Sequence, residues 1–266
     1  MKEPEQVICK LPDRTREIQE IVHHFSSDKD KLQKRIRQTL DFGDEGMSLS
    51  REFDCPSFYL EWVYKKLPPV SQKAFQQATL ALLDSAVADP KNSMSPNSAD
   101  ELLLILHEVF GSDSEARPQI LENLKKIIAN DSTRSIVTQL TPENTVSLHM
   151  RALQMFVGFE TKEPLSFWNQ ILKTYGTSYA GLVLGGVFNQ DFDSGLQWLL
   201  DHRDSQEVLN AFMGSLPYYY ESKFGAKRCD AAINTITPQV PERFARILRD
   251  EQERIKIWLV REAKNK

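Results

Sequence analysis

The sequence has few of the residues that disulfide frameworks and membrane spans require. Its 266 residues include only three cysteines, Cys9, Cys55 and Cys229, with no C-x-x-C pair among them. An odd number at wide spacing is typical of reduced thiols in the cytoplasm. The most apolar stretch, residues 179–188, has about half of the roughly twenty residues that a membrane helix needs. We therefore expect a soluble, cytoplasmic protein without a membrane span.

The sequence also lacks runs that alternate apolar and polar residues, the pattern of a half-buried strand. Glycine is scarce, at 11 residues, and β-branched residues occur singly. The periodic stretches are rich in Leu, Ala, Gln, Glu, Lys and Arg, which lose little side-chain freedom in a helix. Apolar positions recur every three to four residues through most of the chain, enough for about a dozen helices. The sequence predicts an all-α fold.

Two architectures fit helices joined by short turns: a stack of antiparallel pairs and a closed bundle. The pairs beginning near Ser98 and Thr141 do not align as a repeat. We expect an irregular stack of antiparallel helices (an α-solenoid of the HEAT or armadillo type), with an orthogonal helical bundle as the alternative. Gly43 and Gly46 bracket a polar loop. This loop predicts an N-terminal helical hairpin over residues 1–46 and a main helical domain over 47–266, packed as one unit.

Two helix starts are predicted from local patterns. Ser98 precedes Glu101 by three residues, which is the capping-box spacing. Thr141 is followed by Pro142, and proline favours the first turn of a helix. A helix carrying Val146 and the apolar residues after it should therefore begin there.

No metal or cofactor pattern has the required spacing. Residues 189–195 place oxygen ligands at alternating positions, but the glycine and closing glutamate of a calcium loop are missing. Asp191 or Asp193 is better explained as a helix N-cap. Three glycines fit neither a dinucleotide nor a phosphate loop and indicate close helix packing: Gly181, Gly185 and Gly186. We expect no metal and no cofactor.

Catalytic candidates are equally sparse. The five histidines make no H-x-x-x-H pair of the kind that binds zinc on one helix face. His107 and His149 lie on apolar helices, where a core histidine with a hydrogen-bond partner is the commoner outcome. An all-α enzyme whose site combines His107, Glu108 and His149 is the alternative hypothesis.

Two features are candidates for contact with a protein partner, although ordinary core packing of the tyrosines and a solvated flank of the terminal helix are the alternatives. The first is a run of three tyrosines, Tyr218, Tyr219 and Tyr220. Three consecutive side chains cannot all face one core, and tyrosine is favoured at interfaces. Three arginines form a line beside the apolar stripe of the terminal helix: Arg243, Arg254 and Arg261. Within that stripe stands Glu251, which we expect at a packing gap or paired with a basic neighbour.

The sequence therefore favours a helical protein–protein interaction or adaptor module without catalytic activity, whose partner is another protein. The enzyme hypothesis above is one alternative. A nucleic-acid binder using the basic region from Lys223 onward is a second, but the net charge of −4 argues against it, because such domains usually carry a basic excess.

Overall fold

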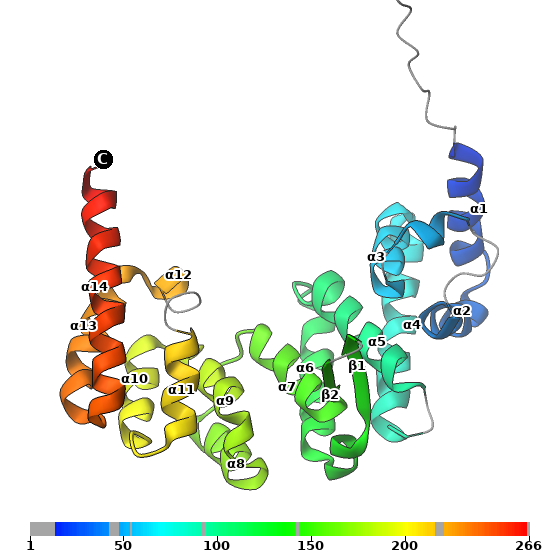
Figure 1. Cartoon of the computed structure of the whole chain (residues 1–266). Coiled ribbons are helices and arrows are strands. Elements are labelled where there is room, and N and C mark those ends of the chain that lie inside the picture. The colour runs from blue at the N-terminus through cyan, green and yellow to red at the C-terminus, as the bar shows by residue number, and fades with distance from the viewer. Residues whose placement is uncertain are drawn as a thin grey trace, which may run out of the picture. The chain divides into compact units, whose positions relative to one another are not determined.

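The computed structural model describes residues 14–42, 48–53, 55–91, 94–141, 144–215 and 221–264. Over these residues the chain is helical, apart from one two-stranded hairpin (Figure 1). The predicted helical class is confirmed, whereas a stack of antiparallel helices stays a prediction. No helix in the described ranges is long and apolar enough to cross a membrane.

Contacts between residues divide the chain into two compact units, Met1–Met155 and Phe156–Lys266. The loop expected to end an N-terminal hairpin lies mostly outside the described residues, and the division at residue 46 stays a prediction. The first unit contains α1 (Thr15–Ser26), α2 (Lys29–Phe42), η1 (Ser48–Glu52), α3 (Pro56–Lys66), α4 (Pro69–Ala88), α5 (Pro96–Phe110), α6 (Ala116–Ala129), η2 (Asp131–Ser135), β1 (Val137–Thr141), β2 (Asn144–Ser147) and the start of α7 (Leu148–Gly158). The second contains the end of α7, α8 (Leu165–Tyr175), η3 (Thr177–Tyr179), α9 (Ala180–Phe188), α10 (Phe192–Asp201), α11 (Gln206–Ser215), α12 (Glu221–Phe224), α13 (Ala226–Ile236), η5 (Thr237–Gln239) and α14 (Glu242–Lys264).

Helix α4 lies at the centre of the first unit, where it contacts α1, α2, α3, α5 and α6. Its Phe75 is fully buried, and its ring lies 6.1 Å from that of Phe25 on α1 and 5.8 Å from that of Tyr64 on α3. Tyr64 in turn meets Phe110 of α5 edge to face at 5.1 Å. Aromatic pairs favour such tilted and edge-on arrangements. The cluster therefore joins the four helices α1, α3, α4 and α5.

Helix α5 begins earlier than its sequence pattern predicts. Ser95, not Ser98, is the N-cap: its Oγ accepts the backbone N–H of Ser98 at 3.1 Å. Ser98 is buried, and its hydroxyl donates to the carboxylate of Asp41 on α2. Glu101 accepts the backbone N–H of Ser57 at 2.9 Å instead of closing a capping box. The capping-box prediction is wrong because partners distant in sequence bind both side chains.

A hairpin replaces the helix start expected at Thr141. β1 pairs with β2 in antiparallel register, with Val137 opposite Ser147, and α7 begins only at Leu148. β-Branched residues such as Val137 and Val146 suit a pleated strand better than a helix. Two expectations are therefore wrong here, the absence of any strand and a helix that begins at Thr141.

A buried ion pair joins α5 to α7 within the first unit. Arg151 Nε lies 2.5 Å from Asp100 Oδ1, and a second guanidinium nitrogen lies 3.4 Å from Asp100 Oδ2. The two side chains are only 17% and 11% exposed. Burial raises the pKa of Asp100, and the opposing effect of Arg151 is smaller. The pair thus fixes two helices at the cost of removing two charges from water.

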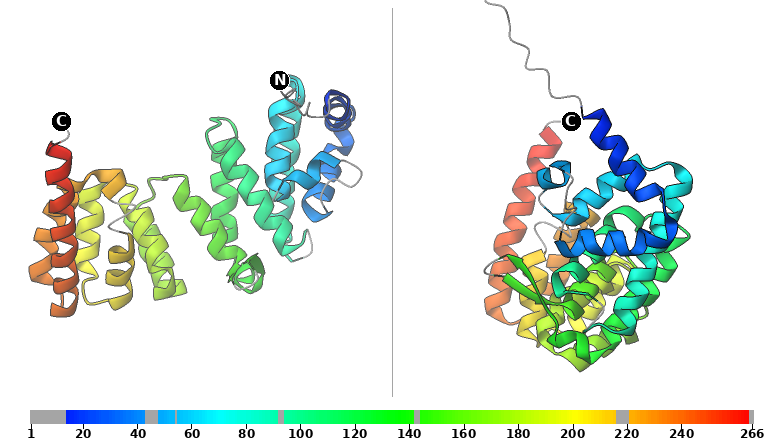
Figure 2. Two further views of the ribbon diagram at one scale, coloured as in Figure 1. Left: turned by 45° about the horizontal axis from the view of Figure 1, so that its top comes forward. Right: turned by 90° about the vertical axis from the view of Figure 1, so that its right-hand side faces the viewer.

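Helix α9 packs against α8, α10 and α11 in the second unit (Figures 1 and 2). Gly186 of α9 faces the ring of Trp168, and a Cβ there would lie 2.1 Å from the indole. Gly195 of α10 meets Phe188 in the same way, at 2.5 Å. Backbone therefore touches aromatic rings directly at both sites, which confirms the predicted packing role for Gly186.

Candidate functional site

The residues predicted to bind a partner are described only in part. Arg243 and Arg254 lie on α14 and both are exposed. The described residues do not include Tyr218, Tyr219 and Tyr220 or the side chain of Arg261. The role of these four residues in partner binding stays a prediction.

Helix α14 has one buried face and one exposed apolar line. Phe244, Leu248 and Ile255 are at most 3% exposed, and the helix contacts α13 and η5. Ile247 and Ile257 are 44% and 55% exposed. At about 100° per residue, Ile247 lies roughly 80° and Ile257 roughly 160° around the helix from the centre of the buried face. In Figures 1 and 2, α14 (red) lies at the edge of the second unit.

The exposed line continues through charged residues, and we call it the α14 strip. Its described members are spaced four and three residues apart and are all exposed: Arg243, Ile247, Asp250, Arg254 and Ile257. This spacing keeps them on one side of the helix.

Both arginines of the α14 strip are held against their own helix. Arg254 Nε donates to Glu251 at 2.8 Å, which confirms the expected basic neighbour of Glu251. The guanidinium carbon of Arg243 lies 4.6 Å from the ring centre of Phe244, within cation–π range. The side chain of Arg254 remains 42% exposed. The strip therefore presents positive charge beside apolar surface, with its arginines already partly ordered.

The basic residues that follow the tyrosines serve the fold. Lys223 Nζ lies 2.6 Å from the carboxylate of Glu160 and 2.7 Å from Oδ1 of the buried Asn189. Arg228 of α13 pairs with Asp193 of α10 at 3.0 Å. These pairs fasten α12 and α13 to the rest of the second unit. They also neutralise part of the basic region on which the nucleic-acid hypothesis depends.

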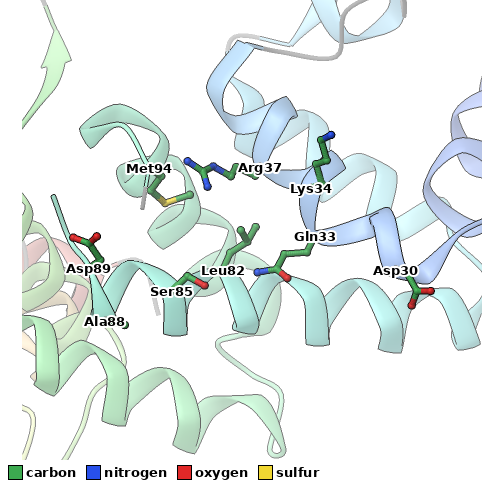
Figure 3. Close-up of a pocket in the computed structure, with 9 residues that line it drawn as sticks. All are labelled: Asp30, Gln33, Lys34, Arg37, Leu82, Ser85, Ala88, Asp89 and Met94. Carbon is green, nitrogen blue, oxygen red and sulfur yellow. The ribbon is translucent and has the colours of Figure 1, made fainter. Parts of the chain in front are cut away.

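The first unit contains a cleft of about 550 Å³ between α2, α4 and the segment that precedes α5. No sequence pattern indicates this cleft. Leu82 and Met94 supply apolar surface, and Gln33 and Arg37 of α2 form a polar rim. In Figure 3 the Gln33 side chain points toward α4 and the Arg37 guanidinium lies near Met94. In sequence, the two polar residues look like the solvent face of an amphipathic helix. Their spacing of four is the only signal that they share a surface.

The candidate catalytic histidines do not line this cleft. His149 is fully buried, and its Nε2 lies 2.7 Å from the carbonyl oxygen of Ile128. Burial lowers the pKa of His149, the largest effect on it. The expected core role of His149 is therefore confirmed. His107 Nδ1 instead lies 3.0 Å from the carboxylate of its neighbour Glu108, near the surface. An enzyme site that combines these residues stays a hypothesis.

The loop that partly matches a calcium site is a helix cap. Asp191 accepts the backbone N–H of Ser194 at 2.8 Å and its hydroxyl at 2.6 Å, which confirms Asp191 as the N-cap of α10. These hydrogen bonds lower the pKa of Asp191. Within the described part of the chain, no group of three or more His, Cys, Asp or Glu residues is placed to hold a metal ion.

Comparison with protein-family models, with curated proteins and with solved structures finds no match to this chain. The α14 strip and the cleft between α2 and α4 are the two candidate sites.

Proposed function

We propose that this chain is a helical interaction module that binds another protein through the α14 strip. The observation that carries the proposal is the exposure of Ile247 and Ile257, 44% and 55%, on one side of a helix whose other side is already packed. Exposed apolar surface rimmed by polar residues can mark an interaction site, and the two isoleucines lie on the same side of α14 with Asp250 and Arg254 between them. Packing within the second unit does not account for them.

The charged residues of the α14 strip also suit an interface. Arginine is enriched at protein interfaces, where it combines apolar contact with hydrogen bonding. Arg254 is held by Glu251 and Arg243 lies over Phe244. Side chains that are ordered before binding lose less conformational entropy when the partner arrives. The strip can therefore bind without first ordering two long side chains.

The test replaces both isoleucines in the full chain, Ile247→Ser with Ile257→Ser, and compares the proteins that native and variant chains capture from cells by quantitative mass spectrometry. We expect the proteins bound by the native chain to be lost from the variant. The matched control is Val70→Ser, because Val70 on α4 is 70% exposed and lies outside the strip. Equal capture by all three chains, with unchanged far-ultraviolet circular dichroism, would remove the strip from the proposal.

The tyrosines are proposed as further contributors to partner binding. The test replaces Tyr218, Tyr219 and Tyr220 with serine. Capture of the same proteins should fall, while the circular dichroism spectrum stays unchanged. Undiminished capture would exclude them.

A second candidate function, ligand binding, is favoured by the cleft between α2 and α4. Its volume of about 550 Å³ falls within the range of small-molecule sites. Arg37 and Gln33 at the rim suit a ligand that carries a carboxylate or an amide. Ser85→Trp would fill the cleft. In a ligand-observed NMR screen, compounds that bind the native chain but not this variant would support the site, and a screen without such compounds would dismiss it.

A further inference from the structure

We infer that the partner of the α14 strip is a second copy of this chain, bound with its α14 antiparallel to the first. This inference rests on the proposed function and names the partner. The strip members recur at alternating intervals of four and three residues, which is the repeat by which two helices pack side by side along their length. Such a repeat predicts which residue of one copy meets which residue of the other.

Antiparallel pairing makes the α14 strip self-complementary. The two helices can be aligned so that Gln252 of one copy lies opposite Gln252 of the other. In this register, Ile247 of each copy lies opposite Ile257 of the other. Asp250 of each copy lies opposite Arg254 of the other. Because a two-fold axis relates the copies, each contact occurs twice. Apolar surface meets apolar surface, and negative charge meets positive charge.

Parallel pairing of the same strip would be unfavourable. It would place Asp250 opposite Asp250 and Arg254 opposite Arg254, and like charges facing each other across an interface cost free energy. Polar residues at such positions fix the orientation of paired helices, although they weaken the pair. The two charges at the centre of the strip therefore select the antiparallel arrangement.

The existing contact of Arg254 is compatible with this arrangement. Its Nε donates to Glu251 at 2.8 Å, and a guanidinium has five N–H donors. An ion pair with Asp250 of the second copy can therefore form without breaking the bond between Arg254 Nε and Glu251. Glu251 also holds the side chain in place, which lowers the entropy cost of the new ion pair.

The contact is expected to be weak. Two isoleucine contacts and two ion pairs form a smaller surface than the roughly 1,200 Å² of stable complexes. We therefore expect a dimer that dissociates at concentrations on the order of tens of micromolar.

The test is sedimentation equilibrium of the purified full chain over a range of concentrations. The average mass should rise from that of the monomer toward twice that value. Asp250→Arg alone and Arg254→Asp alone should each weaken the dimer by about tenfold or more, because each places like charges opposite one another. The two changes together should restore association, because Arg at 250 then faces Asp at 254 of the second copy.

The matched control is Lys256→Glu. Lys256 is exposed on another face of α14 and pairs with Glu253 at 3.0 Å, so this reversal also breaks a surface ion pair. It should leave the dimer unchanged, and circular dichroism should show intact helices in every variant. A monomer at all concentrations, or a double reversal that fails to restore the dimer, overturns the inference. Because only purified chain is present, that result leaves the proposed binding of other proteins to the capture experiment.

Discussion

Gly186 leaves no room for a side chain, since a Cβ there would lie 2.1 Å from the Trp168 ring. We expect Gly186→Ala to lower the free energy of unfolding by about 1–3 kcal/mol or more, because the ring or the backbone must shift. Gly181 is the control on the same helix, where the nearest atom, Ala211 Cβ, would be 3.8 Å away. Gly181→Ala should raise stability by about 0.4–1 kcal/mol. Urea unfolding measures both, and equal effects would contradict this account of the packing.

His149 makes the stability of the fold depend on pH. Burial lowers its pKa below the ordinary value of 6.5, so the unfolded chain takes up a proton at higher pH than the folded chain. The free energy of unfolding therefore has its highest contribution from this histidine above about pH 6.5, and that contribution falls as the pH drops toward the folded-state pKa. His149→Gln keeps a donor for the Ile128 carbonyl and removes this titration.

Unfolding measured between about pH 8 and pH 5 tests the effect, because these limits bracket the ordinary histidine range. The native chain should lose stability more steeply than the His149→Gln variant below about pH 6.5. Parallel curves would show that this histidine is not responsible for the acid sensitivity.

The contact between helices α5 and α7 depends on the ion pair of Asp100 and Arg151. We expect Arg151→Met to lower the free energy of unfolding by about 3–5 kcal/mol, because it leaves a buried carboxylate without its partner. Asp100→Leu combined with Arg151→Met should cost clearly less, since both buried charges are then gone. Thermal unfolding of the three chains distinguishes these cases. A double variant as unstable as the single one would show that packing, and not charge burial, sets the cost.

The elements also show what local sequence can and cannot predict. The apolar spacing of the terminal helix predicts one stripe that includes Phe244, Ile247, Leu248 and Ile255. Phe244, Leu248 and Ile255 are buried, because that periodicity is a property of the helix itself, whereas Ile247 lies at the edge of the stripe and is 44% exposed. The start of α5 was predicted three residues late, since Ser98 has its partner on α2. The hairpin of β1 and β2 was missed because two short strands gain their hydrogen bonds only from each other.

Sequence patterns predict a candidate site only where its residues lie on one element, and not where the fold of the whole chain brings them together. Arg243 and Arg254 were found from the helical repeat alone, and the structure confirms that both are exposed on α14. The cleft between α2 and α4 was not found, because Arg37 and Met94 become neighbours only when segments distant in sequence pack together. The boundary between the two units falls within helix α7, where no loop composition could mark it.

The contact between Trp168 and α9 gives the second unit an optical reporter of its own. The indole is fully buried, and its ring N–H has no hydrogen-bond partner among the described residues. Such an indole emits at the short-wavelength end of the tryptophan range, and its emission shifts to the red when water arrives. Subtracting the spectrum of Trp168→Phe isolates this signal, so that a separation of α8 from α9 would be visible in fluorescence while the helices themselves remain intact.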